Sequence, residues 1–412
     1  MASMLKKSEG IEQSRRRQRF NAHSNSYSSA NSQRIRIDIN SSEEYLDFAN
    51  SYLVFDLEVS GGTDVALPRY TASSWIKEIR VKDRAGNMIG ENIQDYSTLA
   101  RCIFEMNVNL EAEKSYLDAT EGARGVDANT VPATSIASRQ YAHRFVTSIF
   151  GNKNYFPAHL LGGIQIELDM NTAQDVVMDS SIGATYTINN LAYVCDMVKL
   201  KPEVESMVLN QVQQGGLVVD YRSQHSVKGT INTNTTQRFD LGTLNGRVSS
   251  LQAIQVKAKA SQAIDEKDTF SLNNTSNYRF KLGSKYLTES QVECGADKQA
   301  EYMFEWLKSQ KALCNKDMGL YGHQIKELSV LKGNATGGKF VIGQGVDRSQ
   351  SDAVLSSLKD KDHNRLELEL NFSAAPTQAT LYVFANLDKR LVIFPGKQHQ
   401  DNDFAAQGTN MG

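Results

Sequence analysis

Two short segments of the chain repeat the same alternation of apolar and polar residues. Residues 164–171 read IQIELDMN, and residues 366–373 read LELELNFS, 202 positions later. An apolar residue at every second position predicts a strand with one face in a core and the other face in solvent. One such match can arise by chance, so its significance depends on whether the surroundings repeat as well.

The surroundings repeat in the same order. Residues 96–110 and 298–313 each carry apolar residues at spacings of three and four, which predicts a helix with one apolar face. These residues are Leu99, Cys102, Ile103, Met106 and Leu110 in the first segment, and Ala300, Met303, Phe304 and Leu307 in the second. A strand and a Gly-containing turn precede each helix, and an extended run follows each alternating strand. Four elements therefore recur with offsets of about 190 to 205, which indicates two tandem copies of one β-rich domain.

The rest of each copy consists mostly of short alternating segments separated by Gly, Asn, Ser or Asp. Many short strands at regular spacing predict a β-sandwich or jelly roll. Between the copies, Gly215 and Gly216 predict a short hinge, so the two domains should sit side by side without a long tether. The last residues, 398–412, have the composition of a tail.

The N-terminal segment differs from the rest in charge. Residues 1–34 hold seven Lys or Arg and two acids, although the whole chain of 412 residues has a net charge of −2. The segment is also rich in Ser and Asn and poor in aliphatic residues, so residues 1–32 are predicted to be a mobile basic arm. Its basic residues are Lys6, Lys7, Arg15, Arg16, Arg17 and Arg19.

Two interpretations of this basic cluster stay open. The arginines could contact phosphate groups of nucleic acid or lipid, in a manner that salt would weaken. Alternatively, the arm is a solubilising tail or docks on an acidic neighbouring subunit. Few aromatic residues lie between the arginines, which argues against stacking on single-stranded bases.

Cysteine usage and hydropathy bound the compartment. Cys102, Cys195, Cys294 and Cys314 are scattered and form no CxxC pair, which suits a reducing environment and argues against a thiolate zinc site. No apolar run approaches the roughly 20 residues that cross a bilayer, and no apolar signal core follows Met1. We therefore expect a soluble protein made inside a cell.

The search for catalytic motifs identifies no convincing site. Residues 333–340, GNATGGKF, fit a phosphate-binding loop except that Phe340 stands where Ser or Thr would bind magnesium. A strand pattern follows the glycines where that loop requires a helix, so we interpret the segment as a hairpin turn. The seven histidines make no metal-binding spacing, no G-x-S-x-G motif is present, and no carboxylate pair stands out. The sequence predicts no cofactor and no metal.

Four stretches together resemble the double jelly-roll major capsid proteins of the adenovirus and tectivirus lineage, including relatives in virophages and polinton-like viruses. Residues 34–59 are similar to that family's opening strands, and residues 155–171 to its approach to a late strand of the first roll. Residues 278–313 resemble the strand, turn and helix of the second roll, and residues 339–396 its closing strands. The resemblance rests on their order over most of residues 33–396.

The resemblance implies an all-β fold with a few short helices, in which two tandem eight-stranded jelly rolls, residues 33–210 and 217–397, form a double jelly roll. It implies a structural protein without enzymatic activity or small-molecule substrate. Three copies would form a pseudo-hexagonal capsomer that tiles an icosahedral shell, since a duplicated roll gives a trimer six similar sides. The implied partners are neighbouring capsomers and vertex (penton) and minor capsid proteins.

The resemblance also places the protein in the virion capsid, after synthesis in the cytoplasm or nucleus of a host cell. The N-terminal arm would lie on the inner side of the shell, touching the genome or an internal membrane. The longest excursions from the rolls, residues 111–140 and 315–338, are modest, which argues against a tall outer tower.

Two other functions remain as alternatives. A β-sandwich binding module, such as a lectin-like or spike protein, would need a concave aromatic face, and Trp75 and Trp306 are few and lie within patterned segments. A carbohydrate-active enzyme with a jelly-roll core would need a carboxylate pair in a groove.

Overall fold

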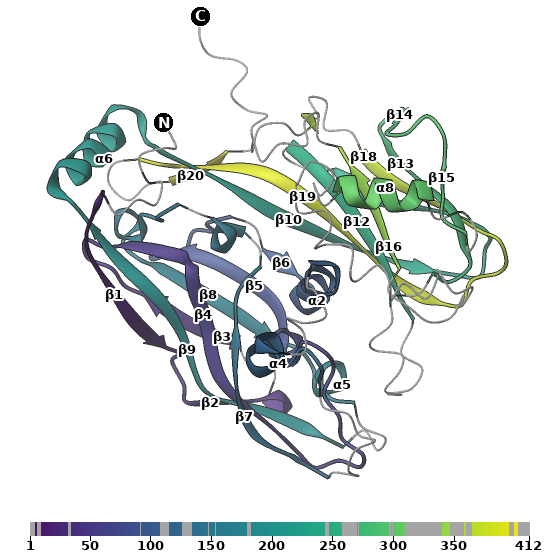
Figure 1. Cartoon of the computed structure of the whole chain (residues 1–412), viewed down its shortest axis with the longest axis horizontal. Coiled ribbons are helices and arrows are strands. Elements are labelled where there is room, and N and C mark those ends of the chain that lie inside the picture. Colours follow the sequence, from purple (N-terminus) through teal and green to yellow (C-terminus); the bar gives the residue numbers. More distant parts are fainter. Residues whose placement is uncertain are drawn as a thin grey trace, which may run out of the picture. The chain divides into compact units, whose positions relative to one another are not determined.

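The computed structural model describes residues 5, 10–31, 34–90, 92–107, 115–125, 134–146, 148–152, 154–178, 183–243, 247–257, 270, 272–295, 298, 300–309, 340–346, 358–359, 365–394 and 399–402 (Figure 1). The chain forms two compact units. The first unit comprises Met1–Arg101, Lys114–Ser223 and Lys389–Asn402, and the second comprises mainly Gln224–Asp388.

The first jelly roll contains two antiparallel sheets. One sheet has the strand order β1 (Glu12–Asn21), β9 (Thr185–Leu200), β4 (Tyr45–Ser60) and β7 (Ile136–His143), and β2 (Ser26–Ser28) also pairs with β9. The other sheet has the order β3 (Arg34–Ile39), β8 (Ile164–Met170), β5 (Ile76–Asp83) and β6 (Ile93–Gln94).

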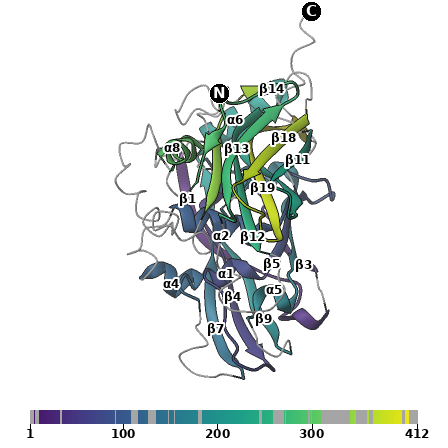
Figure 2. The ribbon, with the colours of Figure 1, turned by 90° about the vertical axis from the view of Figure 1, so that its right-hand side faces the viewer.

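The second jelly roll repeats this plan. One sheet has the order β10 (Leu217–Ile231), β19 (Ala379–Ile393), β12 (Arg247–Lys257) and β16 (Val341–Gly345), with β17 (Leu358–Lys359) on β12 and β20 (His399–Asn402) on β19. The other has the order β11 (Thr236–Thr243), β18 (Arg365–Phe372), β13 (Thr275–Leu282) and β14 (Lys285–Tyr286), with β15 (Val292–Glu293) also on β13. In Figure 2, β13, β18 and β11 lie side by side.

The two rolls therefore have equivalent strand orders, and the predicted duplication is confirmed. The repeated segments of the sequence are β8 and β18, each at the centre of three paired strands. Helices α2 (Tyr96–Asn107) and α8 (Ala300–Ser309) follow β6 and β15 in the two copies. The shorter helices are α1 (Thr71–Ser74), α4 (Tyr116–Glu121), α5 (Ala173–Val176), η1 (Ser29–Asn31), η2 (Ser148–Gly151) and η3 (Ala158–Leu161).

Each roll buries the inward side chains of its sheets. In the first roll, β3 buries Ile35, Ile37 and Ile39 completely, and the indole of Trp75 lies edge-on to Phe55 with ring centroids 5.3 Å apart. Alternation along β18 buries Leu368 and Leu370 in the second roll in the same way. Burying such side chains stabilises the fold by roughly 1.5–3 kcal/mol each.

The predicted apolar face of the second helix is wrong. In α8 the buried residues are Tyr302, Trp306 and Ser309, whereas Phe304 is 57% exposed. Tyr302 and Trp306, four residues apart, decide which face packs inward, and the predicted apolar face included neither of them. In α2, Leu99 and Cys102 are buried as predicted.

The prediction of a mobile basic arm is wrong for residues 12–21, which form β1. All of its described pairing runs through β9, from Glu12 opposite Leu200 to Asn21 opposite Ala192. Phe20 is the one buried residue of this strand. An edge strand held mostly by its backbone needs no apolar alternation, which is why the pattern EQSRRRQRFN did not predict it. The first roll thus begins before residue 33.

The predicted hinge is preceded by a helix that the sequence analysis missed, α6 (Pro202–Gly215). Pro202 opens it, Glu203 and Glu205 lie in its first turn, and Val208 and Val212 are buried one turn apart. Gly216 then adopts φ 88°, and a Cβ there would lie 2.7 Å from Cγ1 of Val392. The two glycines therefore end helix α6, and Gly216 lies too close to Val392 for a side chain.

Several predictions fall on other parts of the chain. The predicted tail is wrong at His399–Asn402, which is β20. Cys314, residues 315–338 and the turn at 333–340, Phe340 excepted, lie outside the described residues, as do residues 111–114 and 126–133 of the excursion 111–140. Among the described helices, none has the length and apolar character needed to cross a membrane.

Candidate functional site: the arginine strand β1

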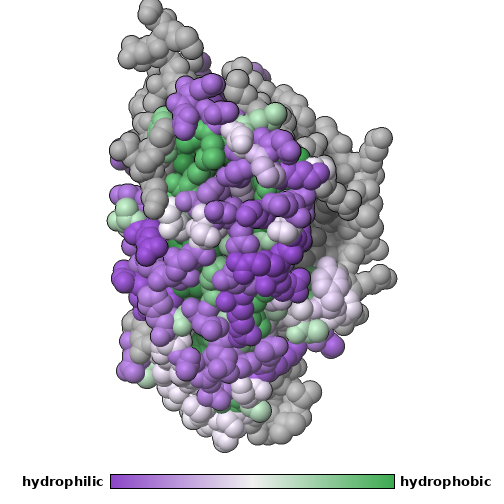
Figure 3. Space-filling model, turned by 90° about the vertical axis from the view of Figure 1, so that its left-hand side faces the viewer, coloured by the Kyte–Doolittle hydropathy of each residue, from purple (hydrophilic) through white to green (hydrophobic). Residues whose placement is uncertain are grey.

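The predicted site residues lie on β1 or outside the described part of the chain. Arg15, Arg16, Arg17 and Arg19 belong to β1, whereas Lys6 and Lys7 are not among the described residues. Arg17 is opposite Asp196 on β9, so the odd-numbered arginines share the outer face of this sheet. Figure 3 shows the side of the molecule on which β1 lies in Figure 1, and its described surface is mostly hydrophilic.

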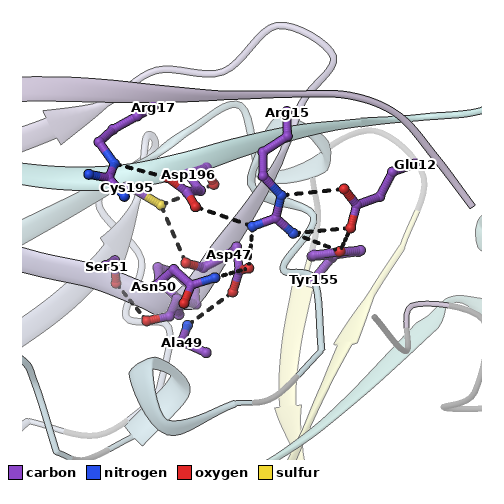
Figure 4. A network of polar contacts seen from close by, with 11 residues as sticks. Glu12, Arg15, Arg17, Asp47, Ala49, Asn50, Ser51, Tyr155, Cys195 and Asp196 are labelled. Carbon is purple, nitrogen blue, oxygen red and sulfur yellow. Dashed lines mark hydrogen bonds and ion pairs between the residues drawn. The ribbon is translucent and has the colours of Figure 1, made fainter. Parts of the chain in front are cut away.

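Arg15 is the centre of the polar network in Figure 4. Its Nη1 donates to Oδ2 of Asp47 at 2.9 Å and to Oδ2 of Asp196 at 3.2 Å. Asp47 and Asp196 are opposite each other on β4 and β9. Two carboxylates in this position repel each other, and a shared guanidinium removes the repulsion.

The Asp47 side chain is fully buried, with 0% exposure. Besides Arg15, it accepts hydrogen bonds from Nδ2 of Asn50 at 2.9 Å and from the backbone N–H of Ala49 at 3.2 Å. A buried carboxylate is tolerated only when it is paired and hydrogen-bonded. Arg15 therefore ties β1 to β9 and β4 by compensating a charge that the fold has already buried.

On its other side, Arg15 meets Glu12 and Tyr155. Its Nη2 donates to Oε1 of Glu12 and to the hydroxyl of Tyr155, both at 3.0 Å, and the Tyr155 hydroxyl also donates to Glu12. The hydrogen bond from Arg15 holds the pKa of Glu12 below its usual value. Burial and the neighbouring Glu12 carboxylate raise the pKa of Tyr155 to about 12.

The other arginines are engaged to different degrees. Arg16 binds Glu44 through two hydrogen bonds of 2.6 Å, and this contact lowers the pKa of Glu44. Arg17 reaches Asp196 at 3.3 Å but remains 63% exposed. Arg19 donates to the backbone carbonyl of Asn190 at 3.1 Å. Arg15 and Arg16 are thus committed to partners within the chain, and Arg17 and Arg19 point their charge more openly toward solvent.

The lowered pKa values of Glu12 and Glu44 make this strand sensitive to acid. Because the folded-state pKa lies below the unfolded value of about 4.5, their contribution to stability is present above that pH and is lost as the pH falls through the lowered pKa. We expect the free energy of unfolding in urea to fall more steeply between about pH 5 and about pH 3 in the native chain than in the Glu12→Gln/Glu44→Gln variant. Equal slopes for the two proteins would contradict this assignment.

A second polar cluster has the residue types of a catalytic relay but no access to solvent. The Tyr96 hydroxyl and Nε2 of His143 are 2.8 Å apart, and Nδ1 of His143 is 2.7 Å from Oε2 of Glu121. Glu121 also accepts from the backbone N–H of Arg144 at 3.1 Å. The side chains of His143 and Glu121 are 0% and 4% exposed, so the cluster is structural. Sequence reasoning could not find it, because its members are far apart in the chain.

The described residues contain no group of three or more His, Cys, Asp or Glu side chains placed to hold a metal ion. Cys102, Cys195 and Cys294 are buried free thiols, and burial raises the pKa of Cys294 well above its usual value. A buried thiol with a raised pKa is a poor nucleophile.

Comparisons with known proteins bear on the whole architecture. No protein-family model and no curated protein matches the sequence. Solved structures with similar folds are double jelly-roll proteins of viruses. The Faustovirus major capsid protein aligns with a TM-score of 0.65 at 8% identity, over 92% of this chain and 90% of that chain.

Two further structures align over similar lengths. VP54 of PBCV-1, as fitted into a reconstruction of the virophage Sputnik, aligns with a TM-score of 0.63 at 10% identity, over 94% of this chain and 96% of that chain. A chain of the Sputnik virophage structure aligns with a TM-score of 0.58 at 11% identity, over 98% and 92% of the two chains. The double jelly-roll fold is therefore established for this chain.

Proposed function

We propose that this chain is a major capsid protein, whose role is to build a shell and not to catalyse a reaction. The observation that carries the proposal is the pair of two-sheet rolls with equivalent strand orders, which aligns with viral capsid proteins over at least nine-tenths of each chain. The polar clusters around Arg15 and His143 support it, because their side chains bind one another and hold strands and loops of the first roll together. The protein then acts in the virion, after synthesis inside the host cell.

The assembly that we propose is a trimer that packs into an icosahedral shell. Three chains with two similar rolls each present six similar sides, so one trimer can meet six neighbours. Contacts within such an obligate trimer bury about 2,000 Å² or more. Contacts between trimers can each be weak, because many form at once. Vertex and minor capsid proteins would complete the shell where six neighbours do not fit.

The mass of the purified protein tests this proposal. Light scattering after size exclusion should give about 137 kDa, three times the chain mass of 45.8 kDa, and negative-stain images should show pseudo-hexagonal particles. Larger closed shells would support the capsid role directly. A monomer at every protein concentration would refute it.

The basic residues of the N-terminal segment remain a proposed contact with phosphate groups on the inner side of the shell. Arg17 and Arg19 carry this proposal among the described residues, with Lys6 and Lys7 beyond them. Arg15 and Arg16 are held closely by carboxylates, whereas the longer contact of Arg17 with Asp196 leaves its side chain 63% exposed. We expect the Arg17→Gln/Arg19→Gln variant to bind duplex DNA more weakly, with the slope of log affinity against log salt reduced by about 2. An unchanged slope on DNA, with weaker binding to vesicles containing an anionic lipid, would assign the contact to a membrane.

A further inference from the structure

Two corresponding sheets, one in each roll, carry the same residues more often on their outer faces than on their inner faces. The sheets are β3-β8-β5 in the first roll and β11-β18-β13 in the second, and their backbone registers are equivalent. Of nine outward positions, five are identical: Arg36/Arg238, Asp38/Asp240, Glu167/Glu369, Arg80/Arg279 and Lys82/Lys281. Of ten inward positions, one is identical, Leu168/Leu370.

This is the reverse of what packing alone would produce. Core residues drift because aliphatic side chains exchange at a cost of less than about 1.5 kcal/mol. Glu167 and Arg80 and their counterparts are mostly buried, so stability accounts for their retention. The exposed charges should drift at least as freely as the core, because a surface ion pair contributes only about 0–1 kcal/mol. These exposed charges are Arg36, Asp38, Arg238 and Asp240. Stability alone therefore does not account for the retention of these four exposed charges.

The retained residues that a partner could reach lie on the edge strands. Strands β3 and β11 each lie at one edge of their sheet, as the structure describes it. Each carries the sequence Arg-x-Asp with both charged residues on the outer face, at Arg36–Asp38 and Arg238–Asp240. The Arg36 and Arg238 side chains are 49% and 63% exposed, whereas their partners Glu167 and Glu369 are 1% and 13% exposed. The glutamates thus hold the arginines from beneath and leave the guanidinium groups in solvent.

The aspartates are anchored and exposed in the same manner. Asp38 contacts His23 and Gln165, each at 2.8 Å, and Asp240 contacts Arg365 at 2.8 Å. Their side chains are still 41% and 46% exposed. Each edge strand therefore presents one positive and one negative group, fixed two residues apart.

We propose that the outward side chains of β3 in one copy pair with those of an antiparallel β11 in a second copy, Arg36 with Asp240 of that copy and Asp38 with its Arg238. The contact is made by side chains, because the backbone N–H of His23 already donates to the carbonyl of Arg36 at 3.2 Å. An Arg-x-Asp sequence is complementary to itself when the second strand runs antiparallel, because each arginine then meets an aspartate. In such an assembly each roll lies beside the other roll of a second copy, so both rolls need the same contact. This need accounts for the retention of Arg-x-Asp on both edge strands. The choice of a second copy as the partner rests on the proposed function.

Charge changes at these four positions test the contact. In the acidic variant, Arg36→Asp/Arg238→Asp, and in the basic variant, Asp38→Arg/Asp240→Arg, like charges meet, so each should self-associate at least about tenfold more weakly than the native chain. In an equimolar mixture, one acidic and one basic copy should associate pairwise within about threefold of the native chain. A closed ring of three must still contain one contact between like charges, so the pairwise step is the one to measure. The variant with all four changes, in which the charges are exchanged, should also associate by itself. Sedimentation velocity at low and high salt measures each step, and the native association should weaken with salt.

If these residues had only a structural role, neither the mixture nor the variant with all four changes would associate again. The variant with all four changes loses the Arg36–Glu167 contact just as the acidic variant does. The control Lys201→Asp/Lys285→Asp reverses two exposed lysines elsewhere and should associate like the native chain. Shell or trimer formation by the acidic and basic variants at native strength overturns this inference and leaves the capsid proposal standing. If the native chain instead forms only a salt-sensitive dimer, and the charge changes at the four positions weaken and restore it as expected, the contact is supported and the capsid proposal is refuted.

Discussion

Replacing Arg15 with methionine is expected to lower the free energy of unfolding by about 3–5 kcal/mol. The substitution keeps much of the side-chain volume but leaves Asp47 buried, opposite Asp196, without the cation that both carboxylates share. It also removes one of the two partners of Glu12, which then keeps the hydrogen bond from the Tyr155 hydroxyl. Urea unfolding at neutral pH, followed by circular dichroism, measures the loss.

Two variants separate this cause from a general loss of charge. Arg17→Met removes an arginine from the same face of the same strand, and we expect a cost of about 0–1 kcal/mol because Arg17 is mostly exposed. Adding Asp47→Asn to Arg15→Met should restore more than half of the lost stability, because the buried negative charge is then gone. Equal effects of Arg15→Met and Arg17→Met would show that Asp47 does not depend on Arg15.

Replacing His143 with alanine is expected to cost a similar amount, about 3–5 kcal/mol. The imidazole fills a fully buried site between Tyr96 and Glu121, and its loss leaves both a cavity and a buried Glu121 carboxylate whose described partner is then a single backbone N–H. The same unfolding measurement applies, together with the melting temperature of the assembled protein.

The matched comparison is His23→Ala. His23 also contacts a carboxylate, Asp38 at 2.8 Å, but its side chain is 55% exposed, so we expect a change within about 1 kcal/mol. Tyr96→Phe should cost an intermediate amount, about 1–3 kcal/mol, because it retains the ring but removes two hydrogen bonds of the hydroxyl, with His143 and from the backbone N–H of Val146. If His143→Ala were as stable as His23→Ala, the buried cluster would have no part in holding the first roll together.

Strand positions with an apolar residue at every second site were predictable, because alternation reports directly on one buried face. The same logic found α2, where Leu99 and Cys102 are buried, and failed on α8, where Tyr302 and Trp306 take the inner face. It also missed α6, because two buried valines one turn apart are too weak a signal in a polar segment.

The basic cluster of the candidate site was predictable from the sequence, but its place in an ordered strand was not. The composition of residues 1–32 indicated a mobile arm, because local composition contains no information about a distant strand. The contacts that order them come from Asp47 and Asp196, which are 32 and 181 positions away from Arg15. A charged edge strand becomes visible only when its backbone partner is known.

The sequence by itself determined that this protein is two copies of one β-rich domain, because alternation and order repeat along the chain and depend on local periodicity alone. Only the tertiary structure decided that β1 completes the first roll and that Arg15 neutralises a buried carboxylate. It alone brought the equivalent Arg-x-Asp sequences to the edges of two corresponding sheets. The physical reason is that pairing across strands and the compensation of buried charge are made between residues far apart in sequence, and no local pattern records which of them will meet.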